Sequence, residues 1–241
     1  MTSILYKNNH LAKLISKFVD AARDISTNRY AEGRCGSMIL DVTSFMPKDS
    51  ADKVAISPEY PIGETMPNLK HRYFYTTAAK CSLEQYSRTP MEYSSIIRIT
   101  ESCDAYEAIA DNLVKFPDDL TLALHAYNMH TDPKLQSICL IHTYPLDLTI
   151  TMMKLGNDTK KFIELGQELS PDQVWTFKKG FISIPKDGNP EFMQQVSEAL
   201  SNKINVFVPK HGLFTFGVEP LAASDKICAL NHIAKLINKT M

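Results

Sequence analysis

The segment SICLIH at residues 137–142 constrains the fold more than any other feature of this chain. It is a short, unbroken apolar run that ends in a histidine, which is typical of a β-strand buried on both faces. A strand of that kind needs a sheet with a covering layer on each side, and helices are the usual cover. The rest of the sequence should therefore contain helices that cover both faces of the sheet.

Apolar residues recur at helical spacing over residues 5–23 and again over residues 219–239. A third helix is predicted to begin near Pro117–Asp119, where a proline and two acids precede further apolar residues at that spacing. The stretch from Pro47 to Pro67 is punctuated by prolines and is predicted to be loop. Strand-like runs lie at 37–42, 71–77, 94–100, 181–185 and 204–209.

This order of elements predicts an α/β fold with a central β-sheet flanked by helices. A length of 241 residues fits one domain that spans residues 1–241. The formal net charge of -1 argues against a nucleic-acid groove or a polybasic membrane patch. We expect no nucleic acid and no membrane as partners, and instead a small molecule or another copy of the chain.

The cysteines and the N-terminus bear on the compartment. Five cysteines without a CxxC pair indicate reduced thiols, and lysines interrupt the apolar residues near the N-terminus, so no signal peptide is expected. No apolar stretch approaches the length of a membrane span. The sequence predicts a cytoplasmic protein.

Two histidines at predicted strand ends are the candidates for chemistry. In SICLIHTYP, strand alternation places His142 and Tyr144 on one face, and a neutral imidazole is the commonest protein metal ligand. His211 lies between a strand that ends in VPK and Gly212, which lets the backbone turn sharply beside it. A core histidine and a surface turn histidine remain the alternatives when each is taken alone.

Three segments carry a resemblance to a known family: AEGRCGSMILDVT (31–43), ICLIHTYP (138–145) and VFVPKHGLFTFG (206–217). Their order and content resemble the landmarks of the class II aldolase/adducin family, over roughly residues 10–237. The resemblance implies that family's single-domain fold. The order and the KHG segment are more specific for fold than for activity.

The resemblance also implies a set of site residues, with departures from the family's pattern. The catalytic glutamate is replaced by Asp119, a metal histidine by Tyr144 and a substrate-holding asparagine by Ser37. The glycine-rich phosphate loop reads Thr77-Ala78-Ala79-Lys80, where Lys80 would compensate as a point charge. The implied assignments are Asp119 as catalytic base; Gly36, Ser37 and Thr77 for substrate; and His142, His211 and Tyr144 for a divalent metal, zinc in the first instance.

Two functions of different classes follow from the resemblance. One is a metal-dependent aldolase that cleaves a ketose 1-phosphate, such as rhamnulose 1-phosphate, to dihydroxyacetone phosphate and an aldehyde. The other is a catalytically impaired family member that acts as a binding or structural subunit. A substrate without phosphate is a third possibility, which the lost loop glycines would suit. The family also implies a homotetramer with active sites near the subunit contacts.

Overall fold

The sheet forms the middle of the molecule in a computed structural model that describes residues 8–47, 50, 55–109, 113–130, 138–177 and 179–241. Its described strands run in the order β2-β5-β4-β3-β1-β6-β9-β8-β7, and every pair is antiparallel except β7–β8. The strands are β1 Ser37–Asp41, β2 Tyr60–Pro61, β3 Tyr73–Thr77, β4 Ser94–Ile99, β5 Ala105–Ala108, β6 Cys139–Thr143, β7 Phe181–Ser183, β8 Asn205–Val208 and β9 Gly212–Gly217.

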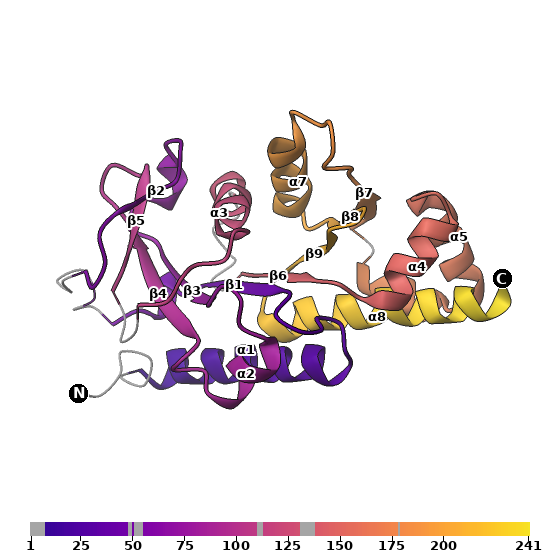
Figure 1. The fold of residues 1–241 in the computed structure, drawn as a ribbon, viewed down its shortest axis with the longest axis horizontal. Coiled ribbons are helices and arrows are strands. Elements are labelled where there is room, and N and C mark those ends of the chain that lie inside the picture. The colour runs from indigo at the N-terminus through magenta and orange to yellow at the C-terminus, as the bar shows by residue number, and fades with distance from the viewer. Residues whose placement is uncertain (1–7, 48–49, 51–54, 110–112, 131–137, 178) are drawn as a thin grey trace.

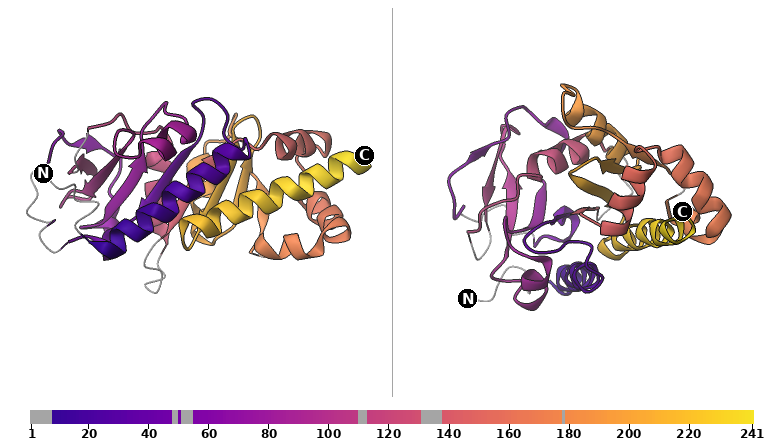
Figure 2. Two further views of the ribbon diagram at one scale, coloured as in Figure 1. Left: turned by 90° about the horizontal axis from the view of Figure 1, so that it is seen from below. Right: turned by 45° about the vertical axis from the view of Figure 1, so that its right-hand side comes forward.

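Helices cover both faces of this sheet, as the buried strand requires (Figure 1). α1, α2 and α8 lie along one face, with α1 and α8 adjacent in the view from below (Figure 2), and α3 and α7 lie on the other face. The helices are α1 Asn9–Thr27, α2 Leu83–Arg88, α3 Leu120–Met129, α4 Leu146–Lys154, α5 Thr159–Leu169, α6 Pro171–Val174, α7 Phe192–Ser201 and α8 Pro220–Thr240.

Each face of the sheet has its own hydrophobic core. Successive residues of β6 point to opposite faces, so Cys139 and Ile141 join the core under α1 and α8, whereas Leu140 joins the core under α3 and α7. All three side chains are buried completely. The prediction of a central sheet flanked by helices is confirmed. Residues 5–7 of the first predicted helix and Ser137 lie outside the described residues.

Tyr127 of α3 anchors that helix to the strands that carry the site. Its hydroxyl donates to the carbonyls of Ile39 in β1 at 2.8 Å and Ile138 at 2.9 Å, and it accepts from the backbone N–H of Leu140 at 3.2 Å. Since a hydroxyl has one proton, the two carbonyls share it. These contacts fix the position of α3, and hence of Asp119 at its start, relative to β1 and β6.

In the part of the chain that the structure describes, no helix is long and apolar enough to cross a membrane.

Candidate functional site

The site is built on one row of residues across the middle of the sheet. Ser37 of β1 is paired with His142 of β6, and His142 is paired with Phe214 of β9. Directly opposed residues in a sheet present their side chains on the same face. The rings of His142 and Phe214 stack accordingly, with centroids 4.0 Å apart and an interplanar angle of 9°. The sheet therefore holds the imidazole in one plane beside the Ser37 hydroxyl.

Asp119 is the residue immediately before α3, and its side chain reaches this row. Its side chain makes no capping hydrogen bond to that helix. Instead its Oδ2 accepts from Ser37 Oγ at 2.9 Å and from His142 Nδ1 at 2.7 Å. An aspartate before a helix often caps it with its side chain, but Asp119 occupies the N-cap position with its backbone alone.

These contacts control the charge of Asp119. Burial alone would raise the pKa of this carboxyl, but the hydrogen bonds from His142, His211 and Ser37, with the charge on His142, hold its pKa well below the usual range. Asp119 is consequently a carboxylate at neutral pH. A carboxylate that stays ionised can act as a metal ligand or accept a proton.

Both ring nitrogens of His142 face acceptors. Nε2 lies 2.8 Å from the backbone carbonyl oxygen of His211, and Nδ1 lies 2.7 Å from Asp119 Oδ2. A neutral imidazole has a single N–H, so donating Nε2–H to the carbonyl leaves the lone pair of Nδ1 directed at a carboxylate. That arrangement is favourable only with a cation between Nδ1 and Asp119.

His211 reaches the same place from the tight connection between β8 and β9. Its Nε2 lies 3.9 Å from Asp119 Oδ1, and its ring centroid lies 4.9 Å from that of His142. Gly212, with φ +108°, allows this approach, because a Cβ at that position would lie 2.3 Å from the carbonyl oxygen of Thr143. Only glycine fits so close to the adjoining strand.

Tyr144 lies beside both histidines, just beyond the end of β6. Its ring centroid is 4.7 Å from that of His142 and 6.2 Å from that of His211. Burial, together with the negative charges of Asp119 and Cys35, raises the pKa of the Tyr144 phenol to about 12. Tyr144 is therefore a neutral phenol at physiological pH.

The donor set suits a divalent metal. Asp119, His142 and His211 each offer one ligand atom, and these atoms all lie within 4.8 Å of one another. Two imidazoles and a carboxylate that leave further positions open are typical of catalytic zinc and of other first-row divalent ions. The Nε2–H of His142 already donates to a backbone carbonyl, as metal-bound histidines usually do with their second nitrogen.

A cavity of about 210 Å³ opens above this cluster. Gly36, Ser37, Asp119, His142, His211 and Tyr144 are among its lining residues, so the structure brings together six of the seven residues assigned from the resemblance. The seventh, Thr77, is fully buried, and its hydroxyl accepts from the backbone N–H of Met38 at 3.1 Å. It does not appear among the residues that line the cavity.

Three cationic side chains, Arg34, Lys80 and Lys115, also line this cavity. Of these three, only Lys80 was expected from the sequence, as the point charge of the segment Thr77-Ala78-Ala79-Lys80. Arg34 lies within the first matched segment and Lys115 lies two residues before Pro117, so their closeness to matched segments was the available signal.

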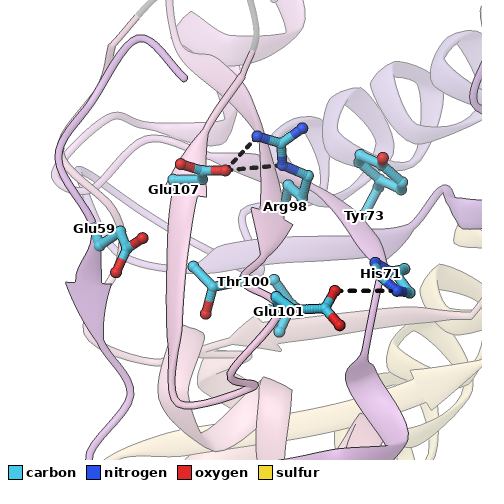
Figure 3. A pocket seen from close by; sticks show the side chains of 8 residues that line it. Glu59, His71, Tyr73, Arg98, Thr100, Glu101 and Glu107 are labelled. Carbon is cyan, nitrogen blue, oxygen red and sulfur yellow. Dashed lines mark hydrogen bonds and ion pairs between the residues drawn. The ribbon is translucent and has the colours of Figure 1, made fainter. Parts of the chain in front are cut away.

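A second cavity, of about 330 Å³, lies beside the strands β3, β4 and β5 (Figure 3). Its charged groups bind one another: Arg98 Nε donates to Glu107 Oε1 at 2.8 Å, and His71 lies 3.3 Å from Glu101. Its lining holds three carboxylates, Glu59, Glu101 and Glu107, against one arginine and one histidine, so this cavity does not suit an anion. The first cavity differs because, within the described part of the chain, no carboxylate forms an ion pair with its arginine or its two lysines.

The chain is similar to known proteins both in sequence and in fold. No protein-family model matches the chain. A rhamnulose-1-phosphate aldolase from Bacteroides thetaiotaomicron is 27% identical over 244 residues, which cover 97% of this chain and 88% of that protein.

Solved structures show the same fold. A sugar-phosphate aldolase from Thermotoga maritima superposes with a TM-score of 0.79 at 17% identity and covers 96% of both chains. An L-fuculose-1-phosphate aldolase from Thermus thermophilus superposes with a TM-score of 0.58 at 13% identity and covers 95% of both. The resemblance seen in the sequence is thereby confirmed: the chain has the class II aldolase fold and is a relative of the class II aldolase/adducin family.

Proposed function

We propose that this protein is a metal-dependent aldolase that cleaves a ketose 1-phosphate such as rhamnulose 1-phosphate. The observation that carries the proposal is the convergence of Asp119, His142 and His211 at one cavity, with their ligand atoms within 4.8 Å of one another. The relative named rhamnulose-1-phosphate aldolase, which matches almost the whole chain, supports this substrate class.

Asp119, His142 and His211 would hold the metal, with zinc as the first candidate from the donor types. The ion supplies Lewis acidity, which polarises a carbonyl oxygen of the substrate. Tyr144 was assigned as a further ligand, but a phenol whose pKa is about 12 is better suited to donate a hydrogen bond to a substrate oxygen.

Asp119 has a second role as the base of the reaction. It takes the proton from the hydroxyl on carbon 4 of the ketose, and the bond between carbons 3 and 4 then breaks. Carbon 4 becomes the carbonyl carbon of the aldehyde product. The bonding electrons stay with the three-carbon fragment, which takes up a proton at carbon 3 and leaves as dihydroxyacetone phosphate.

Gly36 and Ser37 line the cavity and are proposed to contact the substrate or to shape its site. Thr77 is proposed to hold this part of β1 in place, because its hydroxyl accepts a hydrogen bond from the backbone N–H of Met38, the residue after Ser37. We further propose that the protein is cytoplasmic, since all five cysteines are free thiols, and that it assembles as a homotetramer.

The test is a cleavage assay on the purified protein, with dihydroxyacetone phosphate detected by a coupled reaction. Activity should disappear with a chelator and return with added zinc or another divalent ion. Asp119→Asn and His211→Ala should each lower kcat by at least about a hundredfold. His232→Ala, an exposed histidine on α8, is the matched control and should leave the rate unchanged. Stoichiometric metal without cleavage of any ketose 1-phosphate would instead support a binding or structural subunit.

A further inference from the structure

The cations of the site cavity are the feature that the proposed chemistry leaves unused. Arg34 comes from the segment between α1 and β1, Lys80 from the turn after β3, and Lys115 from the segment before α3. Among the described residues, none of the three has a carboxylate within ion-pair distance. Two carboxylates line the same cavity, Asp118 and Asp119, and Asp119 is already engaged with Ser37 and His142.

The backbone N–H groups of the two alanines in this loop, Ala78 and Ala79, are already hydrogen-bonded within the protein. In a glycine-rich loop, backbone N–H groups bind a phosphate directly. Here the N–H of Ala78 donates to the carbonyl of Tyr93 at 2.8 Å, and the N–H of Ala79 donates to the carbonyl of Lys115 at 2.7 Å. Pro117, which also lines the cavity, has no N–H at all. Neither alanine N–H is therefore available to an anion, which leaves the three cationic side chains as the charged donors of this cavity.

The same backbone bond arranges two of those side chains. Because Ala79 is tied to Lys115, the segments that carry Lys80 and Lys115 are held next to each other. Lys80 has φ +57°, a left-handed conformation that marks a tight turn at this rim. Arg34 is adjacent in sequence to Cys35 and Gly36, which also line the cavity. Arg34, Lys80 and Lys115 thus line the same cavity as the metal-binding cluster.

We propose that Arg34, Lys80 and Lys115 bind the phosphate group of the substrate as a dianion, through side-chain charge in place of a backbone cradle. Phosphate is favoured because three separate cations match a compact dianion, and a guanidinium can bind two of its oxygens at once. This inference deepens the proposed aldolase function and rests on it for the identity of the substrate. It also removes the reason to expect a substrate without phosphate, since the lost glycines are replaced by cations.

The binding of inorganic phosphate tests this inference without any turnover. Isothermal titration of the metal-loaded protein should show one phosphate site. Arg34→Gln, Lys80→Gln and Lys115→Gln should each weaken phosphate binding about three- to tenfold, and the triple variant by more than about thirtyfold. Lys161→Gln, an exposed lysine on α5, makes the same change in net charge and should leave the affinity unchanged. Lys80→Arg should restore most of the affinity lost in Lys80→Gln.

The outcomes separate this inference from the proposed reaction. An inactive protein that binds phosphate and loses it in the three variants supports the anion site while refuting the aldolase. An active protein whose phosphate affinity is the same in all variants overturns the anion site alone. Phosphate binding that survives the triple variant but is lost in His142→Ala would place the anion at the metal cluster and would also overturn it. Acetate that binds as tightly as phosphate would refute the selection of a dianion.

Discussion

At the scale of one residue, Ser37 bears on how Asp119, the proposed base, is positioned. An aspartate in place of glutamate brings its carboxylate one methylene less far into the cavity, and a misplacement near 1 Å can cost about a hundredfold in rate. Ser37 is only 1% exposed and donates to the same Asp119 oxygen as His142 does. We therefore interpret Ser37 as a positioning residue for Asp119, in addition to its place on the cavity wall.

Replacing Ser37 tests this role. Ser37→Ala should lower kcat about tenfold and leave KM within about twofold, since one hydrogen bond to a charged group is worth about 1.5–3 kcal/mol. Ser37→Thr, which keeps the hydroxyl, should recover most of the rate. Ser87→Ala, at a partly exposed serine on α2, is the control. A rise in KM without a change in kcat would show that Ser37 contacts the substrate instead.

Tyr144 is the second residue at which this chain departs from the family pattern. Tyr144→His places a third imidazole beside His142 and His211, whose ring centroids lie 4.7 Å and 6.2 Å from the tyrosine ring. The substitution should raise zinc affinity by at least about tenfold, because a neutral imidazole ligates without the cost of deprotonating a phenol whose pKa is about 12. Tyr144→Phe should leave zinc affinity unchanged. Equal zinc binding by Tyr144→His and the wild type would show that the cluster excludes a fourth ligand.

At the scale of the element, most strands and the long amphipathic helices could be predicted, whereas short helices could not. The strand β5 was not predicted, and β2, Tyr60–Pro61, lies in the stretch from Pro47 to Pro67 that was predicted to be loop. The strand predicted at 94–100 is observed at Ser94–Ile99, and the helix predicted at 219–239 is observed at Pro220–Thr240. α4 has the sequence LDLTITMMK, in which β-branched threonine and isoleucine blur the helical period. α7 begins without a side-chain cap, so no start signal marks it.

The same limit applies to the site. Strand alternation was enough to place His142 and Tyr144 together, because a period of two needs no tertiary information. The role of Asp119 could not be decided in this way, since an aspartate before a helix suits both a cap and a catalytic group. The partnership of Ser37 with Asp119 depends on the pairing of β1 with β6 and on the position of α3. Those are long-range contacts that spacing in one sequence does not encode.

The connection between β8 and β9 offers a prediction for a single element. Gly212→Ala combines a left-handed backbone, φ +108°, with a Cβ 2.3 Å from the Thr143 carbonyl oxygen, so the strand end must move. We expect the free energy of unfolding to fall by more than about 3 kcal/mol, together with loss of metal binding. Gly188→Ala has φ +69° and nothing within 4 Å of the added Cβ, and it should cost about 1 kcal/mol. Chemical denaturation measures both, and equal losses would contradict a special requirement at Gly212.

At the scale of the whole molecule, α4 presents an exposed apolar stripe directly after Tyr144 and Pro145. Leu146, Ile150 and Met153 are 64%, 39% and 71% exposed and recur at helical spacing. Contiguous exposed apolar residues often mark an interaction site. We expect the partner to be a second copy of this chain, because the copies in a cyclic assembly present the same surfaces at every contact. A contact between subunits at this stripe would lie close to the site, because α4 begins two residues after Tyr144.

The assembly proposal predicts a solution mass that is a multiple of 27.1 kDa, four times that value for the tetramer. The double variant Leu146→Glu, Met153→Glu should shift the mass toward the monomer, because two charges per copy would be buried in each interface without partners. Ile56→Glu introduces a charge at another exposed apolar residue, 44% exposed, and should leave the mass unchanged. Light scattering coupled to size-exclusion chromatography at micromolar concentration makes the measurement, and circular dichroism verifies that the variants are folded. A wild-type mass of 27.1 kDa refutes the assembly. A tetramer that persists in the double variant leaves the assembly intact but excludes the α4 stripe as its contact.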